Sequence, residues 1–411
     1  MDKIIDAITN LSTDPKNWDQ LLNSLKSVEE HLVKNPAAID HGLVVLNPTH
    51  HSLGMCFLLN CKALANVTTP GFLDQVALFI HQADWRQIRR AGSRFANLCR
   101  HYSEVLISQR SVTVAVRDLK AALILLRPSV NHVTPLHTQY LKVCILAKMY
   151  HQTTVAVDGD VTEIMPGTSA RDLVLYFYYA GIALIGLKRF KRAQMFLQMG
   201  LSVPTTCTHA MLAESYKKYI LVSLIVDGRV PSLSRVLNSM ITRQLQVICK
   251  PYLDFAQAFN TYDPDQAHAV AAAHGELFVA DKNMGLVKQC IQALYRRIIM
   301  RITTTFLTLS LADIATKAKL PTPRDAERLV VRMVEAGEIQ ASIDQPKGWS
   351  PSARPPRTSP TPTPPSWLTA RSGASSKRCA ASAGPTKTCS SPPHADDGVC
   401  PRAAGSGTMT R

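Results

Sequence analysis

The segment FLTLSLADIATKAKL, Phe306 to Leu320, marks a change in the character of the chain. Its first residues alternate large apolar side chains with Thr and Ser, a pattern typical of a short extended segment. Ser310 is a suitable N-cap for the helix that follows. One side of that helix is apolar and consists of Leu311, Ile314, Ala315 and Ala318. The segment therefore predicts a strand that leads directly into a short helix.

A second helix and a second strand follow. PTPRDAERLVVRMVEAG places Pro323 near the first helical position and Gly337 at the stop. The apolar side of this helix consists of Ala326, Leu329, Val330, Met333 and Val334. EIQASID, Glu338 to Asp344, then alternates, with Ile339, Ala341 and Ile343 on one face. The order strand, helix, turn, helix, strand is the outline of a winged helix.

Upstream of Arg301 the apolar residues recur three and four positions apart, which predicts a mainly helical chain. Turn-rich segments interrupt the pattern, among them STDPKN (12–17) and NPAAIDHG (35–42). Short loops between helices favour paired, stacked helices in a solenoid.

One helix pair is more specific. In FYYAGIALIGLKRFKRAQMFLQMGLSVP (177–204), the aromatic and small residues fall at spacings that resemble one tetratricopeptide-type hairpin. The positions concerned are Phe177, Gly181, Phe190, Ala193, Leu197, Gly200 and Pro204. Small side chains allow two antiparallel helices to approach closely. An ordinary tight helix pair is an open alternative, and both interpretations predict a solenoid.

The C-terminal segment has a different composition. The 64 residues from Gly348 hold 11 of the 25 prolines and almost no large aliphatic side chain. We expect residues 346–411 to be a disordered tail, because such a segment cannot bury enough apolar surface to offset the entropy of ordering. The spacing of Cys379, Cys389 and Cys400 is unlike that of a zinc site.

Charge and cysteine usage narrow the class of protein. The net charge is +16, of which the segment from Gly348 carries +6 and the rest of the chain +10. This moderate excess of positive charge gives nonspecific attraction to acidic partners and does not identify a particular one. The other cysteines are scattered through apolar helical stretches, which indicates a reducing compartment rather than a disulfide framework. MDKIIDAITN resembles neither a signal peptide nor a membrane anchor, so we expect a soluble intracellular protein.

Catalytic motifs are missing from the sequence. It contains no Gly-rich phosphate loop, no Gly-x-Ser-x-Gly and no His-Glu-x-x-His. The pairs His50–His51, His268–His274 and Cys56–Cys61 favour caps, a solvated helix face and a buried helix rather than metal ligands. We therefore expect no catalytic residue, no metal site and no cofactor, and we do not expect an enzyme.

Two clusters raise the alternative of nucleic-acid binding. In SYKKYI, Ser215 to Ile220, two lysines lie between two tyrosines. A helix with Tyr216 packed inward and the stems of Lys217 and Lys218 buried is the commoner arrangement. Arg324, Arg328 and Arg332 recur every four residues along the helix that would enter a major groove. Acidic residues on the same helix would repel phosphates and favour a mixed-charge solvated face. These acidic residues are Asp325, Glu327 and Glu335.

Helical repeats that lead into a winged helix resemble the PCI domain, named for the proteasome lid, the COP nine signalosome and translation initiation factor three. Contiguous stretches strongly resemble the signalosome subunit-three family over about residues 1–345. They are HSLG (51–54), SYKKYILVSLI (215–225), NMGLVKQC (283–290), TFLTLSLADIA (305–315) and AGEIQASID (336–344). The expected organisation is a helical-repeat arm over 1–196, a PCI domain over 197–345 with its winged helix from about 302, and the tail.

The resemblance implies an assembly role. Family members join other PCI subunits through the edges of their winged helices, in a complex that removes a ubiquitin-like modifier from cullin subunits of ubiquitin ligases. A different, zinc-bearing subunit performs the cleavage. The implied interface consists of Phe306, Leu307, Thr308, Leu309, Glu338, Ile339, Gln340, Ala341 and Ser342. Cytoplasm and nucleus are the implied locations, with cullin-RING ligases as indirect partners and neither a membrane nor a nucleic acid as a partner. A PCI-type nucleic-acid binder of RNA export or translation initiation is the alternative function.

The tail departs from the resemblance. The family has a further strand of the wing and a long C-terminal helix here, whereas PKGWSPSARPPRTSPTPTPPSW (346–367) predicts neither. We hypothesise that this end is an out-of-frame or aberrant product. Peptides covering 358–371, recovered in stoichiometric amounts from the endogenous protein by mass spectrometry, would refute the hypothesis.

Overall fold

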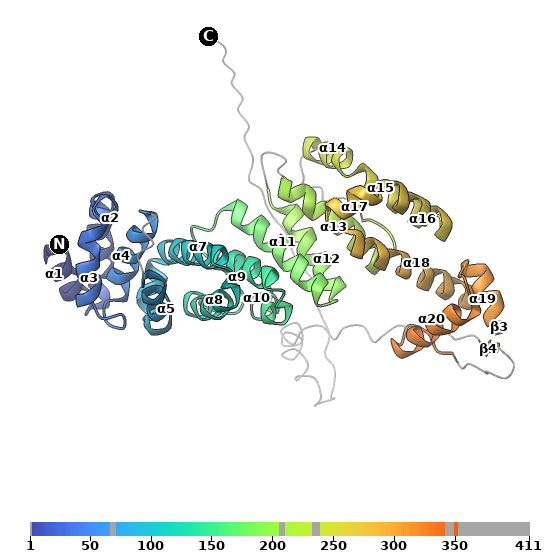
Figure 1. The fold of residues 1–411 in the computed structure, drawn as a ribbon, viewed down its shortest axis with the longest axis horizontal. Coiled ribbons are helices and arrows are strands. Elements are labelled where there is room, and N and C mark those ends of the chain that lie inside the picture. The colour runs from blue at the N-terminus through green and yellow to red at the C-terminus, as the bar shows by residue number, and fades with distance from the viewer. Residues whose placement is uncertain are drawn as a thin grey trace, which may run out of the picture. The chain divides into compact units, whose positions relative to one another are not determined.

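The computed structural model describes residues 2–65, 71–204, 210–231, 239–306, 308–341 and 349–351. Helices dominate these ranges, as Figure 1 shows, and the prediction of a mainly helical chain is confirmed. The tail from 352 onwards, like Leu307, Ser342 and Ile343, lies outside the described residues. No helix in the described ranges has the length and apolar character needed to cross a bilayer.

The N-terminal elements are short helices with one pair of two-residue strands, β1 and β2, which are parallel. Their bounds are α1 (Asp2–Leu11), η1 (Pro15–Asn17), α2 (Trp18–Lys34), α3 (Pro36–Val45), α4 (Ser52–Leu64), α5 (Phe72–Gln82), α6 (Trp85–Arg90), α7 (Gly92–Ser108), α8 (Val112–Leu126), β1 (His132–Val133), α9 (Pro135–Leu146), η2 (Tyr150–Thr153), α10 (Thr154–Val157) and β2 (Glu163–Ile164).

Further helices follow and lead to a small mixed module. Their bounds are α11 (Ala170–Gly186), α12 (Phe190–Ser202), α13 (Ala210–Val226), α14 (Ser239–Ile248), α15 (Lys250–Asn260), α16 (Pro264–Ala273), α17 (Gly275–Ala280) and α18 (Met284–Thr305). The module consists of β3 (Thr308–Ser310), α19 (Leu311–Ala318), α20 (Pro323–Glu335) and β4 (Trp349–Pro351).

One of the predicted breaks is wrong. Residues 36–42, expected as a turn, belong to α3. Asn35 ends α2, and Pro36 occupies a first position of α3, where its missing N–H is not needed. The two helices therefore meet at a single residue without a loop. The other segment, 12–17, is a break between α1 and α2 that contains the short 3₁₀ helix η1.

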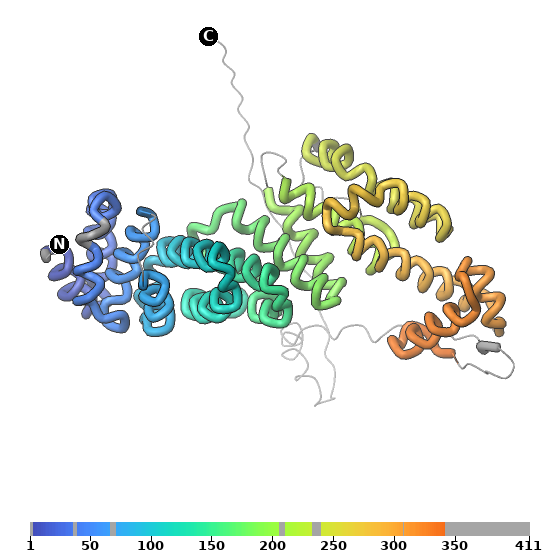
Figure 2. The backbone as a smooth tube through the Cα atoms, in the orientation of Figure 1, coloured from blue at the N-terminus to red at the C-terminus, as the bar shows by residue number. Residues whose placement is uncertain are grey.

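The predicted hairpin at 177–204 is present as α11 and α12, which pack directly on each other (Figure 2). Two of its three glycines, Gly181 and Gly200, lie where the helices touch. A Cβ on Gly181 would lie 2.6 Å from Leu197 Cδ2, and a Cβ on Gly200 would lie 2.9 Å from Phe177 Cβ. The close approach is therefore possible only because these positions lack a side chain.

Replacing Gly200 tests this packing. We expect Gly200→Val to lower the free energy of unfolding by about 2 kcal/mol, because the added atoms force α12 away from Phe177. Gly285, in the first turn of α18, is the matched control, since a Cβ added there would meet no heavy atom within 4 Å. Gly285→Ala is expected to stabilise by up to about 1 kcal/mol. Urea unfolding of both variants checks the opposite signs, and equal effects would contradict the argument.

Candidate subunit interface

The module after α18 is ordered by local capping. The Ser310 Oγ accepts a hydrogen bond of 3.0 Å from the Asp313 N–H, so the predicted N-cap of α19 is confirmed. The Thr322 hydroxyl caps α20 in the same way at 3.2 Å. Pro323 lies in the first turn, and Gly337 follows the helix at φ 70°. These caps explain why the two helices begin and end where the sequence predicts.

The core of the module agrees with most of the predicted apolar faces. α19 and α20 pack against each other and against α18. The buried side chains are Ile314, Ala315, Ala318, Ala326, Val330 and Met333. Leu311 and Leu329 are half-buried. Val334 was predicted to be buried but is 36% exposed, because it lies at the edge of the apolar face of α20.

The predicted strand at Glu338–Ala341 is wrong: the structure shows no strand at these residues. The N–H of Glu338 donates to the Met333 carbonyl at 2.9 Å, closing the C-terminus of α20 instead of joining a ladder. The expected alternation does survive, since Ile339 is buried while Gln340 is exposed. Ala341 packs against the same core.

The strand that pairs with β3 comes instead from the start of the tail. β4 pairs antiparallel with β3, with Leu309 opposite Ser350. The expectation that 346–367 contains no strand is therefore wrong at 349–351. The residues predicted for the first strand are divided: Thr308 and Leu309 are in β3, whereas Phe306 is the C-cap of α18. Thr308 and Phe306 are exposed, and Leu309 is buried.

Charged contacts join the module to the helices before it. Lys319 Nζ lies 2.7 Å from Asp263 Oδ1 and 2.7 Å from Asp265 Oδ2, both at the start of α16. The hydrogen bond from Lys319 holds the pKa of Asp263 below its usual value. Arg296 on α18 donates to Glu338 at 3.2 Å. The module thus has fixed contacts with both α16 and α18.

The three arginines of α20 are all exposed. Arg328 lies 3.7 Å from Asp325, one turn away, and its side chain is 62% exposed. Asp325 and Glu327 are half-buried on the same helix, and Glu335 is exposed. The structure therefore places Arg324, Arg328 and Arg332 among acidic side chains, which is the mixed-charge surface favoured by the sequence.

The lysines of SYKKYI are occupied by ion pairs. Lys217 donates to Glu214 and to Asp281, each at 2.8 Å, and Lys218 donates to Glu214 at 3.3 Å. Burial alone would lower the pKa of Lys217, but the hydrogen bonds to Asp281 and Glu214 outweigh it and raise that pKa. Tyr216 is buried, as expected, and Tyr219 is buried as well. This cluster offers no charge to a phosphate backbone.

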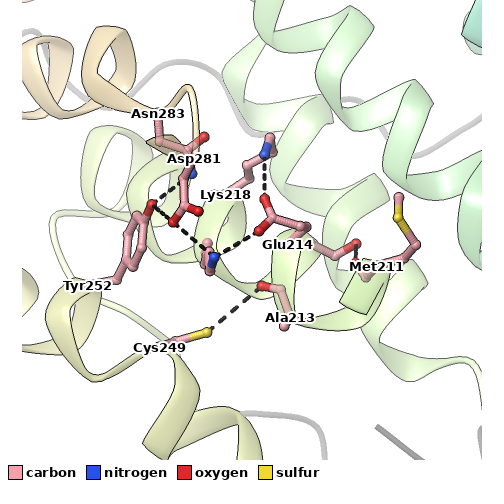
Figure 3. A network of polar contacts seen from close by, with 10 residues as sticks. Met211, Ala213, Glu214, Lys218, Cys249, Tyr252, Asp281 and Asn283 are labelled. Carbon is pink, nitrogen blue, oxygen red and sulfur yellow. Dashed lines mark hydrogen bonds and ion pairs between the residues drawn. The ribbon is translucent and has the colours of Figure 1, made fainter. Parts of the chain in front are cut away.

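These lysines belong to a polar network that connects α13 with α15 and with the residues between α17 and α18. The Tyr252 hydroxyl donates to Asp281 at 2.7 Å and accepts from the Asn283 side chain at 2.9 Å (Figure 3). No sequence signal identifies the network, because Asp281 is 64 positions from Lys217 and 29 from Tyr252.

The groups considered for catalysis have structural roles. Cys56 and Cys61 are buried in α4, and burial raises the pKa of both to about 12. Asn47 donates its N–H to His51 Nδ1 at 3.3 Å beside the start of α4, and His268 pairs with the Tyr295 hydroxyl at 3.2 Å. Across the part of the chain that the structure describes, His, Cys, Asp and Glu side chains nowhere gather in a group of three suited to a metal ion.

Two family models match this chain, and so do curated relatives, two of which are described below. The model described as COP9 signalosome complex subunit 3, N-terminal helical repeats, covers residues 15–241, and the PCI domain model covers residues 270–349. A Dictyostelium discoideum protein described as COP9 signalosome complex subunit 3 is 35% identical over 82% of this chain and 80% of its own length. An Arabidopsis thaliana protein of the same description is 33% identical over 85% of this chain and 81% of its own length. Because the models and relatives agree over most of its length, this chain belongs to the COP9 signalosome complex subunit 3 family.

Proposed function

We propose that this protein is a noncatalytic scaffold subunit of the COP9 signalosome, which assembles the complex that removes the ubiquitin-like modifier from cullin-RING ligases. The observation that carries the proposal is the family relationship, which spans both the helical repeats and the module with the β3 edge. Its partners are the other PCI subunits, and cullin-RING ligases are reached through the complex. Its locations are the cytoplasm and the nucleus.

The proposed contact is the edge of the small sheet. A strand edge presents unpaired N–H and C=O groups that can accept a strand of another chain. In β3, Thr308 is exposed while Leu309 anchors the strand to the core. Phe306 lies beside the strand. Lys317 Nζ lies over its ring, 3.4 Å from the centroid, in a cation–π contact. Gln340 and Ala341 lie in the segment that follows α20. Leu307 and Ser342 lie outside the described residues, and they are included in the proposed contact because of the sequence alone.

The division into an arm over 1–196 and a PCI domain over 197–345 remains a proposal. Residue 196 falls inside α12 (Phe190–Ser202), which packs on both α11 and α13. The helices on the two sides of the division thus share a continuous core, as expected for stacked repeats whose neighbours bury one another.

Affinity purification of the tagged full-length chain from its native cells tests the proposal. We expect other PCI subunits to remain bound after a high-salt wash, because salt screens a backbone-paired, apolar contact only weakly. Thr308→Pro removes a strand N–H and is expected to lower their recovery at least about tenfold. Thr308→Val keeps that N–H and is the matched control. Thermal unfolding checks that both variants fold.

Two results would contradict the scaffold function. One is the absence of PCI subunits after the wash. If the subunits are present but their recovery is unchanged with Thr308→Pro, the β3 edge is rejected as the contact while the scaffold function stands. The other is recovery of RNA with a steep salt dependence that is lost on charge reversal of Arg324, Arg328 and Arg332. That result would favour the alternative, a PCI-type nucleic-acid binder.

A further inference from the structure

Two hollows flank the ridge formed by Arg328 and Arg332 on α20. The first, about 390 Å³, lies between α18 and α20, where Arg296, Leu320 and Leu329 also line it. The second, about 500 Å³, lies along α20, where Val331 contributes to its lining. Arg328 and Arg332 line both hollows. The two guanidinium groups thus lie between two recesses, of which the first is lined by two leucines and the second, otherwise charged, by one valine.

The guanidinium groups of this ridge have N–H donors that are not used by described residues. Arg296 is already engaged by Glu338 at 3.2 Å. Among the described residues, the one partner of the Arg328 side chain is Asp325, at the longer distance of 3.7 Å. The Arg332 side chain makes neither a hydrogen bond nor an ion pair with any residue that the structure describes. A guanidinium carries five N–H donors in a planar fork that matches a carboxylate, so the ridge has unused capacity for an anion.

We propose that this ridge binds an acidic, leucine-containing peptide segment of a partner protein. Its carboxylates pair with Arg328 and Arg332, while its aliphatic side chains lie against Leu320 and Leu329 in one hollow or Val331 in the other. Arginine beside apolar recesses is typical of the residues that dominate protein interfaces. The site does not use the β3 edge, so it goes beyond the scaffold function and can fail separately from it.

The acidic residues around the ridge favour a peptide over a nucleic acid. Asp325 lines the first hollow, and Glu327 and Glu335 line the second. A continuous phosphate backbone laid along α20 would pass close to these carboxylates and be repelled. A peptide can place single carboxylates on the two arginines and neutral residues elsewhere.

Fluorescence anisotropy with the purified full-length chain tests the proposal. The probes are a fluorescein-labelled peptide in which single Glu residues four positions apart are separated by Leu and Ser, the same peptide with Gln in place of Glu, and a single-stranded RNA of equal length. We expect the acidic peptide to bind, the amide peptide to bind at least about tenfold more weakly, and Arg328→Glu or Arg332→Glu each to weaken the acidic peptide about tenfold. Arg171→Glu changes an exposed arginine on α11 and is the matched control.

Milder variants separate a loss of peptide binding from a loss of folding. Arg328→Gln and Arg332→Gln remove the charge but keep a helix-forming polar side chain, and circular dichroism establishes that each variant is folded. Equal binding of the acidic and amide peptides would overturn the proposal. So would an equal loss with Arg171→Glu, or RNA binding that is tighter than peptide binding and depends on the same arginines.

Discussion

Asp281→Ala is expected to lower the free energy of unfolding by about 3 kcal/mol. Asp281 accepts hydrogen bonds from Lys217 at 2.8 Å and from the Tyr252 hydroxyl at 2.7 Å. The side chain of Lys217 is only 13% exposed, so the substitution leaves a largely buried ammonium with Glu214 as its remaining carboxylate. The expected loss is at the lower end of the range for breaking a buried pair because Glu214 stays in place.

Chemical denaturation as a function of pH checks this prediction. Burial by itself would raise the pKa of Asp281, but the hydrogen bonds from Lys217 and Tyr252 outweigh it and lower that pKa. A carboxylate with a lowered pKa stabilises the fold above its unfolded pKa, and this contribution is lost as the pH falls through the folded pKa. The difference between wild type and Asp281→Ala should therefore be full above about pH 4 and shrink below it.

Asp254→Ala is the matched control for this experiment. Asp254 is half-buried in α15, the helix that carries Tyr252, and its side chain has no hydrogen bond or ion pair with any residue in the described ranges. We expect its loss to change the free energy of unfolding by less than about 1 kcal/mol. A similar effect of the two substitutions, or a difference that persists unchanged at acidic pH, would argue against the network as the cause.

Asp118→Ala is the second large effect, expected at about 3 kcal/mol. Asp118 is completely buried on α8, where it accepts from the Tyr102 hydroxyl at 2.6 Å and from His81 Nε2 at 3.0 Å. Arg117 Nε donates to the same carboxylate at 3.1 Å. Tyr102 is 1% exposed, so its hydroxyl would lose its acceptor while it is largely shielded from water.

A double-mutant cycle isolates the contribution of the Tyr102 hydroxyl. Tyr102→Phe alone is expected to cost about 1 kcal/mol. In the presence of Asp118→Ala the same change should cost much less or stabilise, because it removes a buried donor that has no acceptor. Urea unfolding of the two single variants and the double variant provides the measurement. Strict additivity would show that Asp118 acts through something other than this hydrogen bond.

Local features of the fold could be predicted from the sequence because they depend on neighbouring residues. The cap at Ser310, Pro323 in the first turn of α20, the stop at Gly337 and the close packing at Gly181 follow from turn chemistry and from spacings of three and four residues. The strand at Glu338–Ala341 was predicted from the alternation of apolar and polar side chains. That alternation shows which side chains face the core, but it does not show which acceptor a backbone N–H will bind. The helix cap took that N–H instead.

The sequence by itself determined the helical class, the helical hairpin and the strand, helix and helix that begin the terminal module, since periodicity and capping act within a few residues of each other. Only the tertiary structure decided that β4 pairs with β3, that Lys217 and Lys218 are held by Glu214 and Asp281, and that the arginines of α20 stand between two hollows. Those contacts join residues far apart in the chain. The free energy that selects them comes from burial and desolvation around the whole packed module, which no local pattern records.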